Sequence, residues 1–425
     1  MTADRAGDSL PKPVVTASSG TVVDSSSARS SQQGAGQRFR PDIEGLRAVA
    51  VGLVLLFHGY GRPVTGGFVG VDVFFVISGF LITSLLLAEQ IRNGRISIMG
   101  FYARRVRRIL PASALVVILT VVAAYHYLGF ITGNDVATDA KWTAVFSANI
   151  HFALIGTDYL GSLQPPSPLQ HMWSLGVEEQ FYVVWPGLFL LLVVIVRGAR
   201  HRNALAATLL LIIGLSLTWS VVETMSDVTW AYFSPLTRAW ELALGALVAV
   251  LAPTIGRLSA GWPTQLIALC GLIGIGLSAF VIDASTPYPG SAVALPVVST
   301  ALVIAAGCAN VDTFVGRALS VRPMQWLGAR SYSLYLWHWP LLIIAAQYVG
   351  DELSRWQNTG LLLIAVIASA LSYRLVENPI RRARVLRSRT GLSLAIGAAL
   401  IVGTILLAQC FIATHHGTWN PFQTG

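Results

Sequence analysis

Long hydrophobic stretches dominate this chain, and most of its polar residues lie in the segments between them. A stretch of about 17–25 apolar residues is long enough to cross a bilayer as one helix. The pattern predicts an all-α, polytopic membrane helix bundle of about eleven transmembrane helices. The predicted spans cover residues 45–62, 67–88, 110–128, 181–196, 204–222, 233–252, 264–282, 291–308, 332–349, 358–375 and 391–413.

Composition supports a membrane protein. Of the 425 residues, 54% are hydrophobic and only 12% are charged, with a mean hydropathy of +0.64. A soluble domain would carry about 25% charged residues. The net charge of +9 in such a protein reflects topology first, so we expect no nucleic-acid partner. The three cysteines show no pairing pattern, and we expect neither a disulfide nor a metal site.

The arginines indicate the orientation. With the N-terminus inside, 25 of the 29 basic residues fall on inside segments, as the positive-inside rule favours. An odd number of spans then places the C-terminus outside. We expect a multi-pass protein of the cell inner (cytoplasmic) membrane. Residues 141–156 are apolar but short, and we expect an interfacial or re-entrant piece there.

The chain divides by composition into four parts. Residues 1–37 are rich in Ser, Gly and Ala and predict a disordered cytoplasmic tail. Residues 38–382 form the membrane domain with ten spans. Residues 383–413 form a basic linker and the eleventh span, and residues 414–425 form an external tail.

The first span carries two side chains that a bilayer disfavours, Arg47 and His58. Eleven residues of helix place both on one face, about 16 Å apart. Arg47 can clamp an anion or snorkel as a topology anchor, and His58 can be a base or a polar helix contact. The hairpin to the second span can bring Asp72 near His58 as its orienter. Ser78, deeper in that span, is a donor-site candidate or a small packing residue.

Two further stretches carry candidate chemistry. Four arginines precede the third span and can cradle a phosphorylated ligand or contact lipid headgroups. Glu178 and Glu179 are expected at the outer membrane edge, where one of them can be a general base. Trp173 and Tyr182 beside them can stack on a sugar or form an aromatic belt. The four arginines are Arg104, Arg105, Arg107 and Arg108.

Three weaker features complete the candidates. Arg238 and Glu241 are spaced as an i,i+3 pair at the head of the sixth span, more typical of a structural contact. His338 lies between two tryptophans, so a site residue and a member of an aromatic belt are equally compatible with it. Glu377 opens ENPIRR and indicates a helix end with carboxylate–arginine contacts.

These stretches together resemble the membrane-bound acyltransferase type 3 family of envelope-glycan O-acyltransferases. The motifs, in order, are RAVAVGLVLLFH, GGFVGVDVFFVISGFLI, RRVRRILP, HMWSLGVEEQFY, SYSLYLWHWPL and ENPIR. The resemblance implies that Arg47 and His58 are essential. It places the family's Trp-Ser-Leu and Glu-Glu positions on Trp173, Ser174, Leu175, Glu178 and Glu179. It extends to forms in which a last span leads into an external serine-hydrolase-like domain.

The resemblance implies transfer of an acyl group (acetyl, succinyl or similar) from cytoplasmic acyl-CoA to an extracytoplasmic hydroxyl. The acceptor would be a glycan or glycolipid, and His58 would be the base or would carry the acyl group. Acyl-CoA is then a co-substrate, with membrane lipid as the surroundings and no tightly bound cofactor. Buried charges in a helix bundle also fit a proton-coupled transporter or a flippase of an envelope precursor.

Overall fold

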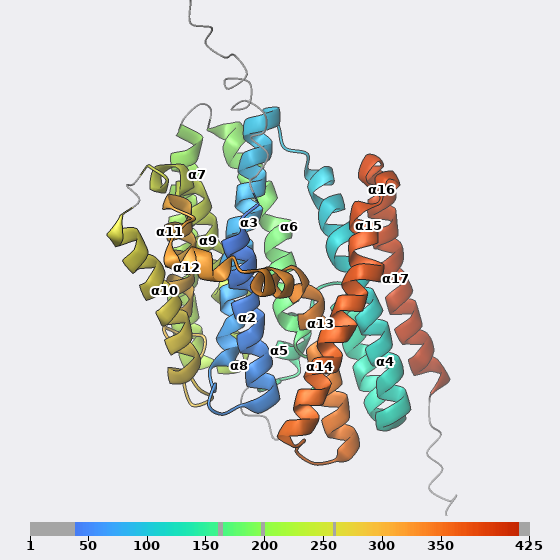
Figure 1. Ribbon diagram of the computed structural model, residues 1–425. Coiled ribbons are helices and arrows are strands. Elements are labelled where there is room, and N and C mark those ends of the chain that lie inside the picture. Colours follow the sequence, from blue (N-terminus) through green and yellow to red (C-terminus); the bar gives the residue numbers. More distant parts are fainter. Residues whose placement is uncertain (1–38, 160–164, 197–199, 258–260, 416–425) are drawn as a thin grey trace, which may run out of the picture. The chain divides into compact units, whose positions relative to one another are not determined.

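The computed structural model describes residues 39–415 except 160–164, 197–199 and 258–260, and this part of the chain is helical with no strand. Figure 1 shows the long helices side by side as a bundle. They are α2 (Pro41–Tyr60), α3 (Gly70–Asn93), α4 (Ile98–Ala144), α6 (Met172–Ile195), α7 (Arg200–Ser226), α9 (Pro235–Ile255), α10 (Trp262–Val281), α11 (Ala294–Ala309), α13 (Arg322–Val349), α14 (Arg355–Ser372) and α17 (Thr390–Thr414).

Each of the predicted apolar runs overlaps one of these helices. Short elements join them: η1 (Gly67–Val69), α5 (Ala148–Leu154), α8 (Val228–Phe233), α12 (Phe314–Leu319), the π-helical turn η2 (Tyr373–Glu377), α15 (Asn378–Arg382) and α16 (Arg384–Ser388). The predicted tail 1–37 and residues 416–425 of the predicted external tail lie outside the described residues.

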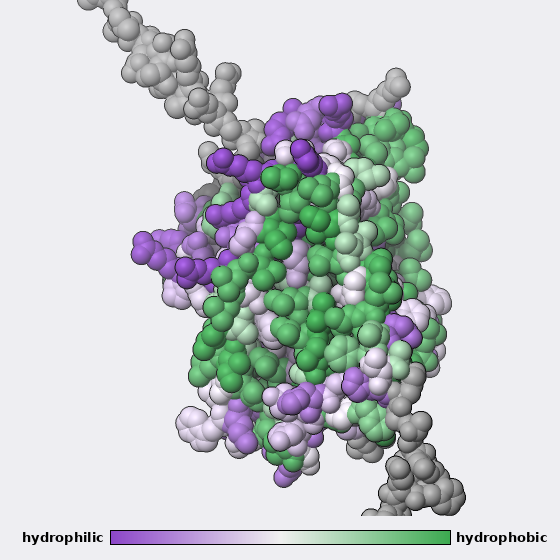
Figure 2. All heavy atoms as spheres, turned by 90° about the vertical axis from the view of Figure 1, so that its right-hand side faces the viewer, coloured by the Kyte–Doolittle hydropathy of each residue, from purple (hydrophilic) through white to green (hydrophobic). Residues whose placement is uncertain are grey.

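Nine helices of the described segments are long and apolar enough to cross a membrane, and α11 is a shorter apolar helix. Figure 2 shows hydrophobic side chains over the middle of the visible face and hydrophilic ones toward its two ends. Such a band suits a protein whose helices satisfy their own backbone groups inside lipid. The chain is therefore a multi-pass membrane protein.

Helix ends follow local sequence. α14 begins with a capping box, in which Ser354 and Gln357 each bond the other's backbone N–H. α3 and α13 end at Gly94 and Gly350, which adopt φ values of 65° and 75°. Glycine takes these left-handed conformations without steric cost, so each helix stops where the sequence supplies one.

Two helices depart from the predicted spans. α4 begins twelve residues before the predicted span and continues to Ala144 after a kink at Gly129, whose φ of 83° is not helical. The predicted interfacial piece 141–156 therefore comprises the end of α4 and the short helix α5. α6 begins nine residues before its predicted span, because the polar residues Glu178 and Glu179 are inside the helix and not at its edge.

The cysteines are free, and Cys270 and Cys410 lie exposed on the helix surface. On the surface of a membrane helix they face an apolar environment, which suits a small hydrophobic side chain.

Glycines allow the core helices to touch. A Cβ on Gly79 would lie 1.8 Å from the carbonyl oxygen of Leu242, and one on Gly245 would lie 1.9 Å from that of Val76. The two sites are reciprocal, so α3 and α9 cross with their backbones in contact. This crossing places α3 at the centre of the candidate site.

Candidate active site

A cavity between α2, α3, α4, α6 and α13 carries three guanidinium groups, from Arg47, Arg105 and Arg108. We call it the arginine cavity. Its other polar lining residues are Ser78, Ser174, Glu178, Tyr182, Ser331, Tyr332 and Tyr335. On α3 it extends from Leu85 to Val71, and fourteen residues of helix correspond to about 21 Å. It is therefore a long, narrow space that enters the bundle from the end bearing the arginines.

Buried hydrogen bonds hold the carboxylates of this cavity. Ser78 donates its hydroxyl to Glu178 over 2.6 Å, and the Tyr182 hydroxyl donates to the same carboxylate. Arg105 donates to Glu179 over 3.0 Å, and its guanidinium lies 4.0 Å from the centre of the Tyr182 ring. Both carboxylates thus face the guanidinium group of Arg105, which offsets the cost of burying their charge.

Glu178 and Glu179 were expected at the outer membrane edge and the arginine run at the cytoplasmic face, but the structure brings both glutamates next to Arg105. The additional turns of α6 place both side chains inside the bundle, against Arg105. Trp173, one turn earlier, is fully buried and lies 5.4 Å from the guanidinium of Arg238. It is part of the core and not of an aromatic belt.

The side chains of the four arginines 104, 105, 107 and 108 point to different parts of the structure. Arg105 and Arg108 line the cavity with Arg47, whereas Arg104 pairs with Glu89 over 2.6 Å. Arg107 donates to Ser393 over 2.9 Å and to a backbone carbonyl before α17. The expected four-arginine cradle is therefore wrong, because a helix turns successive side chains to different faces.

A histidine pair lies beyond the inner end of the cavity. Nδ1 of His58 lies 3.0 Å from Nε2 of His338. Nδ1 of His338 lies 2.7 Å from the carbonyl oxygen of Tyr335. A carbonyl only accepts, so Nδ1 of His338 carries the proton and its Nε2 is an acceptor. Nδ1 of His58 is then the donor, and the lone pair of His58 is on Nε2.

The second ring nitrogen of His58, Nε2, contacts a tyrosine hydroxyl. The Tyr159 hydroxyl lies 3.2 Å from Nε2 of His58, and burial raises the pKa of this phenol above its usual range. Tyr159 therefore stays protonated and donates to Nε2. The ring of Trp339 packs edge-on at 4.5 Å from that of His58. The imidazole is thus held on three sides in one tautomer and one orientation.

Asp72 was expected to orient His58, and the structure corrects this. Both ring nitrogens of His58 have other partners. Asp72 instead accepts from Arg238 over 2.8 Å and from Tyr288 over 2.5 Å. Arg238 also pairs with Glu241 over 3.2 Å, which confirms the expected i,i+3 contact. This buried triad joins α3 to α9, and His338 occupies the position that Asp72 was expected to fill.

Glu377 behaves partly as expected. It is buried, accepts from Ser333 over 2.9 Å and lies 3.8 Å from Arg381, so the carboxylate–arginine contact is confirmed. The helix does not end there, because a π-helical turn carries the chain on into α15. Glu377 therefore ties α13 to this irregular turn.

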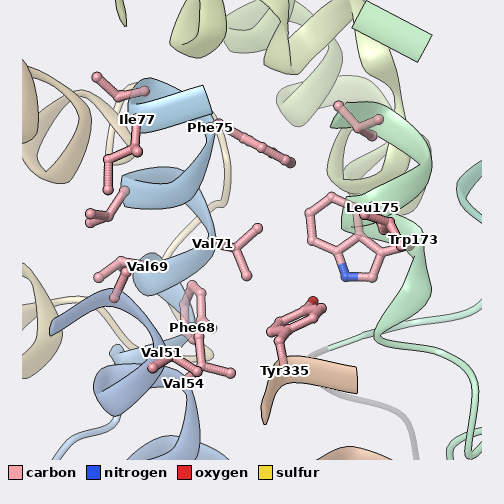
Figure 3. Packing of buried hydrophobic residues seen from close by; sticks show 14 of the residues in the cluster. Val51, Val54, Phe68, Val69, Val71, Phe75, Ile77, Trp173, Leu175 and Tyr335 are labelled. Atoms are coloured by element: carbon pink, nitrogen blue, oxygen red, sulfur yellow. The ribbon is translucent and has the colours of Figure 1, made fainter. Parts of the chain in front are cut away.

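Sequence patterns did not single out Tyr159, His171 or Tyr335. The Tyr335 hydroxyl donates to the carbonyl oxygen of His171 over 2.8 Å. Tyr335 also lines the arginine cavity and precedes His338 by one helical turn. Figure 3 shows Tyr335, Val71 and Trp173 pointing toward one another from α13, α3 and α6. One turn of α13 thus separates the cavity from the histidine pair; the only sequence signal was the density of aromatic residues around His338.

The structure thus shows a multi-pass helix bundle with an internal cavity lined by three arginines and a buried histidine pair beside it. Residues 40–374 match the family described as "Acyltransferase domain". The chain belongs to this family, and the resemblance seen in the sequence is confirmed.

Among curated relatives, YrhL of Bacillus subtilis is 33% identical over 356 residues, which is 81% of this chain and 55% of that protein. The peptidoglycan O-acetyltransferase OatA of Listeria monocytogenes is 30% identical over 358 residues, covering 81% and 56%. The O-acetyltransferase OatA of Staphylococcus aureus is 30% identical over 355 residues, covering 81% and 58%. The chain thus spans a little over half the length of these relatives. No solved structure matched the chain.

Proposed function

We propose that this protein is a membrane O-acyltransferase that moves an acetyl or similar acyl group from acyl-CoA to a hydroxyl of an extracytoplasmic glycan. The main supporting observation is the arginine cavity: Tyr335, which lines it, precedes His338 of the histidine pair by one helical turn. The family and the printed activities of its relatives support acyl transfer to an envelope glycan.

The donor fits the cavity by charge and width. Coenzyme A is a polyanion with a long, thin arm that ends in the thioester. Guanidinium forks suit its phosphates better than ammonium groups do, and Arg47, Arg105 and Arg108 supply three. The cavity follows α3 from Leu85 to Val71, and this elongated form suits an extended arm better than a compact nucleotide. The phosphates would therefore lie at the arginine-bearing mouth, with the arm directed toward Tyr335 and His58.

His58 then supplies the base. An acceptor hydroxyl that replaces the Tyr159 hydroxyl at Nε2 gives its proton to that nitrogen as its oxygen attacks the thioester carbonyl. The C–S bond breaks, the thiolate takes the proton from Nε2, and the products are an ester and a free thiol. In the covalent route Nε2 attacks the thioester carbonyl, the C–S bond breaks and the thiolate leaves. The acceptor oxygen then attacks the acyl group on Nε2, the N–C bond breaks, and the hydroxyl proton goes to the thiolate. Both routes need the lone pair on Nε2, which His338 maintains.

The proposed topology has eleven spans, counting α11 and α13 with the nine apolar helices. The N-terminus and the arginine-rich loops are in the cytoplasm, the C-terminal end of α17 is outside, and the membrane is the inner one. This orientation exposes the arginine cavity to the compartment in which acyl-CoA is made. Residues 1–37 are proposed as a cytoplasmic tail, 38–382 as the acyltransferase domain, 383–413 as linker and last span, and 414–425 as an external tail.

The test supplies acyl-labelled CoA and an envelope glycan extract to proteoliposomes containing the native chain, His58→Ala or His126→Ala. His126 is an exposed residue of α4 that is remote from the cavity lining, so its substitution controls for the loss of an imidazole. We expect label in the glycan with the native chain and His126→Ala and none with His58→Ala. Equal labelling of the glycan by all three proteins would reject the proposed catalytic role of His58. Vectorial movement of an envelope precursor without any thioester turnover would favour the transporter or flippase.

A further inference from the structure

A second cavity lies toward the opposite end of α4 from the arginines. It is lined by the last turns of α4, the helix α5, residues 155–158, residues 165–168, Gln170, and Gln347 near the end of α13. Its volume is about 660 Å³, within the range of small-molecule binding sites. We call it the acidic cavity. Its main polar residues are Asp135, Asp139, His151, Asp158, Gln170 and Gln347.

Asp139 organises one wall of the acidic cavity. It accepts from Ser167 over 2.5 Å and contacts Nε2 of His151 over 2.9 Å. The Trp142 ring stacks on His151, with the ring centres 5.3 Å apart and the planes within 7° of each other. These contacts join α4, α5 and Ser167 into one polar wall.

Gln170 supplies an unsatisfied acceptor in the same cavity. The residue is 2% exposed, and its Oε1 has no hydrogen-bond partner among the described residues. A buried carbonyl oxygen without a partner costs about 1–3 kcal/mol. A ligand hydroxyl or amide N–H that reaches Oε1 would recover that cost.

Two chain segments connect the acidic cavity to the histidine pair. Asp158 lines the cavity, and the next residue, Tyr159, bonds Nε2 of His58. Gln170 lines the cavity, and the ring centre of the next residue, His171, lies 5.7 Å from that of His338. The cavity-lining residues Asp158 and Gln170 are thus each the direct sequence neighbour of a residue that contacts the histidine pair.

The two cavities differ in the charge of the side chains that line them. Three carboxylates line the acidic cavity, from Asp135, Asp139 and Asp158, whereas three guanidinium groups line the other. Carboxylates accept hydrogen bonds from hydroxyls and repel phosphates. The acidic cavity therefore suits a neutral polyhydroxyl compound and disfavours coenzyme A.

We propose that the acidic cavity binds the acceptor, a neutral sugar unit of a glycan, and presents one of its hydroxyls toward Nε2 of His58. Gln170 accepts a hydrogen bond from the sugar, and the Asp139–His151 wall contacts its other hydroxyls. This inference rests on the proposed acyltransferase function, of which it names the acceptor site.

Binding can be measured apart from catalysis. The full chain in lipid nanodiscs is titrated with N-acetylglucosamine tetrasaccharide, and with its sulfated form as an anionic comparator. Gln170→Leu removes the unsatisfied oxygen at similar volume, so its cost to folding is small. Asp139→Asn is the second variant. Gln409→Leu is the control, because Gln409 is exposed, outside the cavity lining, and bonded to Lys141.

We expect saturable binding of the neutral sugar, weaker binding of the sulfated one, and a Kd raised about threefold to tenfold in Gln170→Leu. Asp139→Asn should raise the Kd as well, and Gln409→Leu should leave it unchanged. The proposal is overturned if the native chain shows no saturable binding, if it prefers the anionic sugar, or if both cavity variants bind as the native chain does.

Thioester turnover by the same samples distinguishes the two proposals. A chain that turns over acyl-CoA but binds the sugar independently of Gln170 and Asp139 keeps the proposed function and loses this acceptor site. Sugar binding that depends on Gln170 without any thioester turnover keeps the site and rejects the acyl-CoA reaction.

Discussion

At the residue scale, the tautomer of His58 is set by His338, which lies 280 positions later in the chain. A backbone carbonyl orders the tautomer of His338, and His338 in turn orders that of His58. Hydrolytic triads use a carboxylate for this role. Here a neutral imidazole does it, which places no additional charge beside His58 in the bundle.

His338→Ala is expected to lower kcat for acyl transfer by roughly 100-fold or more, because His58 loses the acceptor that holds its proton on Nδ1. KM for acyl-CoA should change little, since the arginines are untouched. His338→Gln can place a carbonyl oxygen near the same position and should restore part of kcat. A parallel loss of kcat and of donor affinity, with no rescue by Gln, would show that His338 only supports the fold. Steady-state kinetics of the three proteins measure this.

Adjacent arginines give a matched pair for the donor site. Arg105→Ala should raise the Kd for acyl-CoA about 10–100-fold, because a charge-assisted contact is worth about 1.5–3 kcal/mol. Arg104→Ala should leave it unchanged, since Arg104 pairs with Glu89 away from the cavity. Isothermal titration of both variants with a nonhydrolysable thioether analogue measures the two constants, and equal effects would contradict the cavity assignment.

At the element scale, the site depends on how closely α3 and α9 approach. Their crossing is stabilised by paired glycines and by the buried contacts of Arg238 with Asp72 and Glu241. Backbone contact of this kind is a common way to pack helices in lipid, where the hydrophobic effect supplies little attraction. Because Ser78 adjoins Gly79, the same crossing also positions Glu178.

Gly79→Ala should destabilise the fold by about 1–3 kcal/mol, since the new methyl group overlaps the Leu242 carbonyl and must push the helices apart. Gly52→Ala is the control, because a Cβ at Gly52 meets nothing within 4 Å and alanine favours helix by about 0.5–1 kcal/mol. Thermal unfolding in detergent compares the two. An unchanged melting temperature for Gly79→Ala would contradict the close crossing.

At the scale of the whole molecule, two cavities of opposite charge lie on either side of one histidine pair. In the proposed function, the three arginines of one cavity bind the anionic donor and the three carboxylates of the other bind the neutral acceptor. An enzyme built in this way transfers only the acyl group and never needs to carry a whole substrate across the bilayer. The design requires the two cavities to open on opposite sides of the membrane.

Single cysteines test that orientation. In a background with Cys270, Cys308 and Cys410 replaced by alanine, Ala284→Cys should react with an impermeant maleimide applied to intact cells. Asn93→Cys should react only after the cells are permeabilised. Both positions are exposed in short connections, Asn93 at the end of α3 and Ala284 between α10 and α11. The reverse pattern would invert the proposed topology.

The sequence by itself determined the class of protein and the approximate position of each long helix, and it singled out Arg47 and His58 as candidate site residues. These are local properties. An apolar run long enough to cross a bilayer must be a helix, and an ionisable side chain within such a run is energetically costly, which indicates a functional role. The spacing of Arg238 and Glu241 on one helix likewise predicted their contact.

Only the tertiary structure decided which side chains meet. Asp72 bonds Arg238 across 166 positions, Ser78 bonds Glu178 across 100, and His58 bonds His338 across 280. Helical periodicity sets the face on which a side chain lies, but not the neighbouring helix that the face meets. That choice depends on close crossings such as the one between α3 and α9, which minimise unpaired polar groups and unfilled space over the bundle as a whole.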